Sequence, residues 1–168
     1  MIAIDTQILV HAHRRDSTWH APARTAITQL AESGARWAIP MHCLVELYAK
    51  VTHPKLYRPA STPAQALAQI DAWLESPSVE ILVESGHTWT ATRDLLAAAR
   101  IVGSQSYDAR IAAVCLQHGV TELWTDDRDF LSFPALRVRN PLLDIQPTRA
   151  GERSQAYRAT RRRTASRR

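Results

Sequence analysis

The sequence has little cysteine and no long hydrophobic run, and both shortages limit what the protein can be. Its 168 residues include two cysteines, Cys43 and Cys115, and neither belongs to a CxxC or Cys/His pattern of the zinc-site type. A disulfide framework of the kind that holds small secreted proteins together is therefore excluded. No apolar segment approaches the ~18 residues that cross a bilayer, and the N-terminus reaches Asp5 without the basic and apolar regions of a signal peptide. We expect a reduced, cytoplasmic protein with no membrane association.

The charge is unevenly distributed along the chain. Hydrophobic residues make up 45% of it and charged residues 22%, as in a globular domain, and the formal net charge is +5. Residues 149–168 contain eight arginines and one acid, Glu152, so this segment carries +7 and residues 1–148 carry −2. We therefore divide the chain into a globular domain, 1–146, and a flexible basic tail, 147–168.

Short apolar segments alternate with segments of helical periodicity. Helical spacing of apolar residues begins at Ile8, Leu9 and Ala12, directly after the first strand. Further predicted helices cover about 17–33, 40–52, 62–76, 86–100 and 106–118, the last capped by Ser106 and ended by Gly119. The predicted strands are 2–4, 37–39, 79–83, 122–125 and 136–138. This alternation predicts an α/β fold with a central parallel sheet flanked by helices.

Acidic residues follow two of the predicted strands. Asp5 ends the first strand, and the acidic segment 126–129 follows the strand at 122–125. Glu46 lies in an apolar helix, and Asp108 lies in the first turn of another, where an acid commonly serves only the helix dipole. Each acid alone has an ordinary structural explanation. If they converge at one edge of the sheet, however, they need a divalent cation to offset their repulsion, and carboxylate oxygens suit Mg²⁺ or Mn²⁺.

These residues form a pattern that resembles a known family. The segments Ile4-Asp5-Thr6, Val45-Glu46-Leu47, Tyr107-Asp108-Ala109 and the stretch from Thr125 to Phe130 (TDDRDF) are similar, in order and spacing, to the motifs of PIN-domain nucleases. The resemblance is closest to the VapC-type toxins of bacterial type II toxin–antitoxin systems, and it covers about residues 1–140. It implies a PIN-like, Rossmann-like fold and an Mg²⁺-dependent endoribonuclease, with Mn²⁺ as a possible substitute, that hydrolyses RNA. It also implies a homodimer neutralised by a cognate VapB-type antitoxin.

The resemblance assigns roles to individual residues. Asp5, Glu46 and Asp108 correspond to the family's metal-binding, catalytic carboxylates, and the closing motif selects Asp127 as the fourth. This sequence has one acid more than that motif requires, so the choice between Asp126 and Asp127 stays open. The auxiliary residues implied are Asp126, Asp129, Thr6 and Thr125, with the threonines orienting carboxylates or bound water.

Other features have ordinary interpretations beside functional ones. His11 and His13 do not share a helix face, which favours structural histidines over metal ligands. The tail arginines are either a solvated terminus or an RNA-holding arm whose affinity falls with salt: Arg161, Arg162, Arg163, Arg167 and Arg168.

Two other protein classes with acids at strand ends each need a residue that this sequence lacks. A dehalogenase-type phosphatase needs a second Asp where Gln7 stands, and a receiver domain needs a late lysine that this chain lacks. The serious alternative is a catalytically silent PIN-like module that binds RNA or protein.

Overall fold

The sheet consists of five parallel strands in the order β3-β2-β1-β4-β5. We describe residues 1–144 in a computed structural model. The strands are β1 (Ile2–Ile4), β2 (Trp37–Pro40), β3 (Val79–Leu82), β4 (Glu122–Trp124) and β5 (Val138–Arg139). The predicted α/β fold with a central parallel sheet is therefore confirmed.

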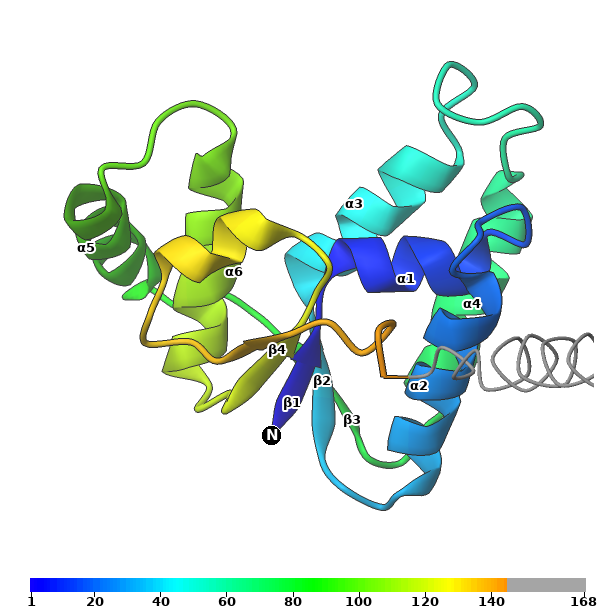
Figure 1. Ribbon diagram of the computed structural model, residues 1–168, viewed down its shortest axis with the longest axis horizontal. Coiled ribbons are helices and arrows are strands. Elements are labelled where there is room, and N and C mark those ends of the chain that lie inside the picture. Colours follow the sequence, from blue (N-terminus) through cyan, green and yellow to red (C-terminus); the bar gives the residue numbers. More distant parts are fainter. Residues whose placement is uncertain (145–168) are drawn as a thin grey trace, which may run out of the picture.

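Helices cover the two faces of this sheet, as Figure 1 shows, with α5 and α6 on one side and α1, α2 and α4 on the other. The elements are α1 (Thr6–His13), α2 (His20–Glu32), α3 (Met41–Val51), α4 (Pro63–Leu74), α5 (Thr88–Ala99), α6 (Gln105–Gln117) and the 3₁₀ helix η1 (Arg128–Ser132). In the part of the chain described, no helix is both long and apolar enough to cross a membrane.

The strands are apolar on both faces because helices cover both. Trp37, Ala38 and Ile39 of β2 are completely buried, as are Ile4 of β1 and Leu123 of β4. Burial on this scale explains why these short segments read as continuous apolar runs. The polar residues directly after β1 and β4, Asp5 and Thr125, are buried as well.

The strand order reverses at β1, which positions the site. The chain runs from β1 outward through β2 to β3, and then returns to place β4 on the other side of β1. Ile4 is in register with Trp124, and the backbone N–H of Asp5 donates to the carbonyl of Trp124 at 3.0 Å. Asp5 and Thr125 therefore leave adjacent strands at the same edge, where ligands bind in sheets of this kind.

Some predicted boundaries are wrong by a few residues. The helix predicted from 106 begins at Gln105 after Ser104, and the Ser106 hydroxyl donates to the Gly103 carbonyl inside the first turn, so Ser106 is not the cap. The last strand lies at 138–139 instead of 136–138, because Phe133 and Leu136 are taken up by a turn that packs on the core. The predicted tail, 147–168, lies outside the described residues.

Candidate metal centre

The candidate acids meet at the carboxyl edge of the sheet, although they come from four separate parts of the chain. Asp5 is the N-cap residue of α1 and Asp127 that of η1, while Asp108 lies in the first turn of α6. Glu46 lies in the middle of α3, the helix that follows β2. The fold therefore brings to one place the residues that the sequence pattern selects.

Asp5 forms the buried end of the group, with 3% of its surface exposed. Its Oδ2 accepts a hydrogen bond from the Thr125 hydroxyl at 2.8 Å, and its Oδ1 lies 3.8 Å from the Cys43 thiol, which donates to it. Burial raises the pKa of Asp5 to about 6, although the hydrogen bonds from Thr125 and from the backbone oppose this rise. A nearby cation would favour the ionised form that this environment penalises.

Glu46 is held in the ionised form. Its Oε2 accepts from the Thr6 hydroxyl at 2.7 Å, and its Oε1 lies 3.0 Å from the Lys50 ammonium, one helical turn away. Burial raises its pKa, but the hydrogen bonds from Thr6 and Lys50 outweigh this effect, so that the pKa lies below its usual value. Thr6 and Thr125 thus each donate a hydrogen bond to one carboxylate.

Three carboxylates form the tightest part of the group. One oxygen from each of Asp108, Asp127 and Asp129 can be chosen so that all three lie within 4.8 Å of one another. The pKa of Asp108 is raised to about 7, first by burial and then by the charges of the other acids, which in decreasing order of effect are Asp127, Asp5, Asp129 and Glu46. The negative charges of these four acids therefore all disfavour the ionised form of Asp108. Such a set, with only hard oxygen donors, fits a divalent cation such as Mg²⁺ or Mn²⁺.

The structure separates Asp126 from Asp127. The Oδ2 of Asp126 lies 3.1 Å from Nε2 of His11, so this side chain is directed to α1. Asp127 joins Asp108, and its Oδ1 accepts from the backbone N–H of Asp129 at 2.9 Å, while its own N–H donates to the Thr125 hydroxyl. Thr125 is thereby bonded to both Asp5 and Asp127.

Reasoning from sequence missed three side chains that contact the acids. Lys50 pairs with Glu46, and its i,i+4 spacing was a signal that could have revealed it. Cys43 lies completely buried behind Asp5, where burial raises the pKa of its thiol well above the usual value. Nothing in the sequence indicated this neighbour. The sequence did not indicate that His11 contacts one of the acids, Asp126, at 3.1 Å.

The predicted RNA-binding arginines of the basic tail are not among the residues that the structure describes. They are Arg161, Arg162, Arg163, Arg167 and Arg168. The structure therefore brings together the acids and the two threonines but does not place the tail.

Comparison with known proteins identifies the family of the chain. The family model described as PIN domain matches residues 2–136. The chain is 32% identical over 142 residues to "VapC ribonuclease Mb2897" of Mycobacterium bovis, covering 84% of this chain and 96% of that protein. It is 31% identical over 138 residues to "Ribonuclease VapC48" of Mycobacterium tuberculosis, covering 82% and 94%.

Solved structures share the fold. The crystal structure of VapBC2 from Rickettsia felis, bound to a promoter DNA fragment, superposes with a TM-score of 0.62 at 22% identity, covering 83% of this chain and 98% of that chain. VapC20 of Mycobacterium tuberculosis, described as a toxin that cleaves the sarcin–ricin loop, gives 0.59 at 17% identity, covering 79% and 94%. At these identities the likeness concerns the fold.

Proposed function

Because the chain belongs to the PIN-domain family, we propose that it is a divalent-metal-dependent endoribonuclease that acts as the toxin of a toxin–antitoxin pair. The observation that carries the proposal is the group of close carboxylates of Asp108, Asp127 and Asp129 at the edge of the sheet, where burial and then the neighbouring acids raise the pKa of Asp108. Relatives named ribonuclease along most of the chain support the choice of RNA as substrate.

The proposed reaction is in-line hydrolysis of an RNA phosphodiester bond. When bound, Mg²⁺, or Mn²⁺ in its place, supplies a water of lowered pKa as the nucleophile and stabilises charge on the phosphoryl oxygens. In this assignment Asp5, Glu46, Asp108 and Asp127 would hold the ion, with Asp129 as the auxiliary acid at the exposed side. The ligand set itself is part of the proposal.

The other side chains of the site position these carboxylates. The Thr125 hydroxyl donates to Asp5 and accepts from the backbone of Asp127, so one side chain fixes two of the proposed ligands. The Thr6 hydroxyl donates to Oε2 of Glu46, and the Lys50 ammonium pairs with the other oxygen, Oε1. No serine, cysteine or histidine nucleophile is needed, because the proposed nucleophile is water. Cys43, the thiol beside Asp5, is buried, and its raised pKa keeps it protonated.

The proposal extends to partners and location. Several structures with this fold are toxin–antitoxin complexes, among them VapBC of Salmonella typhimurium, which supports a VapB-type antitoxin for this chain. We further propose that the protein is a homodimer, that it acts in the cytoplasm, and that residues 1–146 form the PIN domain with 147–168 as a basic tail.

RNA cleavage with and without EDTA tests the central proposal. The purified protein should cut cellular RNA in Mg²⁺ and lose this activity in EDTA, while Asp5→Ala and Asp108→Asn should abolish it and remain folded by circular dichroism. Full activity in a folded preparation of either variant would refute the assignment. A wild-type protein that binds RNA but does not cut it in Mg²⁺ or Mn²⁺ would instead identify a silent PIN-like binding module.

A further inference from the structure

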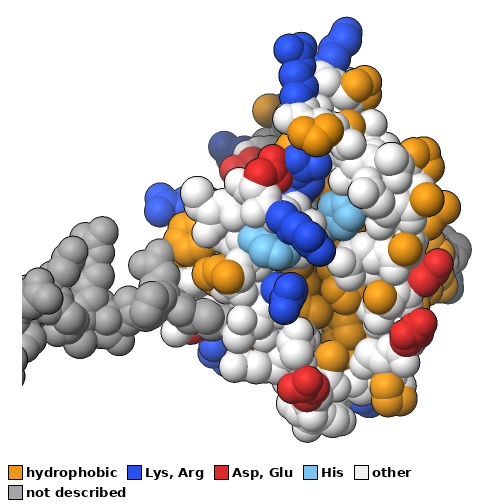
Figure 2. Space-filling view, turned by 90° about the vertical axis from the view of Figure 1, so that its right-hand side faces the viewer, with side chains coloured by type: hydrophobic (Ala, Val, Ile, Leu, Met, Phe, Trp, Pro, Cys, Tyr) orange, Lys and Arg blue, Asp and Glu red, His pale blue; other side chains and the backbone are white. Residues whose placement is uncertain are grey.

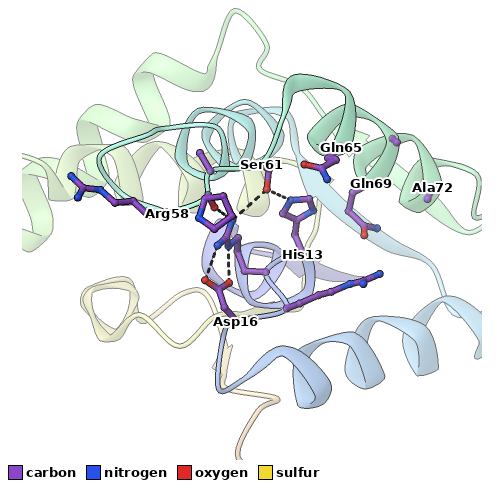
Figure 3. A pocket seen from close by; sticks show the side chains of 12 residues that line it. His13, Asp16, Arg58, Ser61, Gln65, Gln69 and Ala72 are labelled. Atoms are coloured by element: carbon purple, nitrogen blue, oxygen red, sulfur yellow. Dashed lines mark hydrogen bonds and ion pairs between the residues drawn. The ribbon is translucent and has the colours of Figure 1, made fainter.

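A polar recess lies between the end of α1, the loop before α4, and α4 itself, away from the carboxylates. Its volume is about 750 Å³, and its lining includes Arg14, Arg15, Arg58 and a single acid, Asp16. The recess lies on the side of the molecule that Figure 2 faces, where lysine, arginine and histidine side chains gather near the centre of the view. Figure 3 shows the recess from close by.

Arg14 lines the recess, and its positive charge is already paired with Asp16. It is 8% exposed, and its Nε and Nη2 donate to the two carboxylate oxygens of Asp16 at 2.8 and 2.6 Å. Its Nη1 donates to the Pro59 carbonyl at 3.0 Å, and its guanidinium lies 4.3 Å from the centre of the Tyr57 ring. The one acid of the lining is thus neutralised by the one buried arginine.

Arg15 and Arg58 supply the uncompensated charge. Both are exposed, and neither makes an ion pair or a side-chain hydrogen bond within residues 1–144. They come from separate walls, since Arg15 follows α1 and Arg58 belongs to the loop before α4. The lining therefore carries a local excess of two positive charges on a body, 1–148, that is −2 overall.

The rest of the lining is polar and uncharged. His13 lies with its Nε2 2.8 Å from the Ser61 hydroxyl, as Figure 3 shows, and burial together with Arg14 lowers its pKa, so it is neutral at pH 7. Gln69 of α4 makes no side-chain hydrogen bond among the described residues. The apolar members are small, and the recess offers no large apolar pocket of the kind that anchors a protein partner.

The recess is connected to the metal centre by α1. This helix begins with Thr6 beside the carboxylates and ends with His13 in the recess, a distance of roughly 10 Å along its axis. A strand whose phosphodiester lies at the carboxylates would thus reach the recess a few nucleotides away. We propose that the recess binds the phosphate backbone of the RNA substrate through Arg15 and Arg58, outside the bond that is cut; this proposal rests on the proposed function.

Binding without cleavage tests it. The full chain carrying Asp108→Asn would be titrated into a labelled oligouridylate of about 20 nucleotides at several salt concentrations, with and without Arg15→Ala plus Arg58→Ala. Each lost phosphate contact should reduce the steepness of log K against log salt by about 0.7, so the pair should reduce it by about 1.4 and weaken binding severalfold. Arg93 is an exposed arginine of α5 on the far side of the sheet, so Arg93→Ala serves as the control. It should change the salt slope and the affinity by less than half of what the double substitution does.

The replacement of both arginines by lysine should keep the salt dependence, because the charges remain. An unchanged slope and affinity in the double alanine variant would overturn the proposal. So would a variant that keeps its RNA affinity but loses binding of a polyglutamate peptide, since the recess would then serve an acidic protein segment. Because nothing is cleaved in this assay, its result is independent of whether the wild-type chain cuts RNA.

Discussion

At the residue scale, the two adjacent aspartates Asp126 and Asp127 have different partners. Asp126 is directed to His11, whereas Asp127 shares a group of close oxygens with Asp108 and Asp129. The backbone N–H of Asp127 also donates to the Thr125 hydroxyl, which in turn donates to Asp5. Metal affinity should depend on Asp127 alone of the pair.

Substituting each of the two aspartates tests this distinction. Asp127→Asn should reduce RNA cleavage at least about 100-fold, because it removes a proposed ligand. Asp126→Asn, which has the same change of charge one residue earlier, should leave activity within about threefold of the wild type. Initial cleavage rates over a range of Mg²⁺ concentrations measure both. Equal losses in the two variants would mean that the fourth acid is not set by the geometry described.

Asp108 makes stability depend on pH when metal is absent. Its pKa rises from an ordinary value of 3.8 to about 7 in the folded chain, so the folded state binds its proton more tightly than the unfolded state. The free energy of unfolding should therefore fall as the pH rises from about 4 to about 7. Since the carboxyl is only half-buried, the loss attributable to it is on the order of 1–2 kcal/mol after allowance for solvent screening.

Thermal unfolding in EDTA at pH 5 and pH 8 measures this effect. Asp108→Asn should lose less stability than the wild type between these pH values, because the amide does not ionise. Added Mg²⁺ should raise the midpoint of the wild type at pH 8 and that of the variant much less. Parallel pH profiles for the two proteins would show that the acids do not repel one another as described.

At the scale of elements, the termini of helices differ in how their backbone groups are satisfied. Thr62 caps α4 completely: its hydroxyl accepts from the N–H of Gln65, and the Gln65 side chain accepts from the N–H of Thr62. Ser104, at the start of α6, makes no such bond. The start of α4 was predicted correctly at residue 62, whereas the start of α6 was misplaced because Ser106, two residues after Ser104, looked like the cap.

Alanine substitution at these two positions should give unequal results. Thr62→Ala should lower the free energy of unfolding by about 1 kcal/mol, because the N–H of Gln65 loses the hydroxyl that accepts its hydrogen bond. Ser104→Ala should change it by no more than a few tenths of that. Urea denaturation with a common slope measures the pair. A loss of the same size in both variants would contradict the role of the capping box.

At the scale of the whole molecule, charge is divided between two regions. The body holds the proposed metal ligands and has a net charge of −2, while residues 149–168 carry +7. An acidic body repels RNA except where a bound cation or a local basic site, such as the recess, offsets its charge. The basic segment could add attraction without sequence preference.

Deletion of residues 150–168 tests the contribution of the basic segment. It removes seven arginines and one glutamate, so RNA binding should weaken and depend less steeply on salt. The midpoint of thermal unfolding and the cleaved bond should stay the same, since the described core lies within residues 1–144. An unchanged salt slope would count against an RNA-holding arm.

The sequence by itself predicted the α/β alternation, the approximate positions of the strands and a group of candidate acids at one edge of the sheet. It could do so because buried strands must be apolar and because the residues after parallel strands share one edge. Only the tertiary structure showed that Asp126 contacts His11, that Cys43 lies beside Asp5, and that a basic recess forms between α1 and α4. The first two contacts join residues 115 and 38 positions apart, and side-chain direction at that range depends on packing that no local pattern encodes.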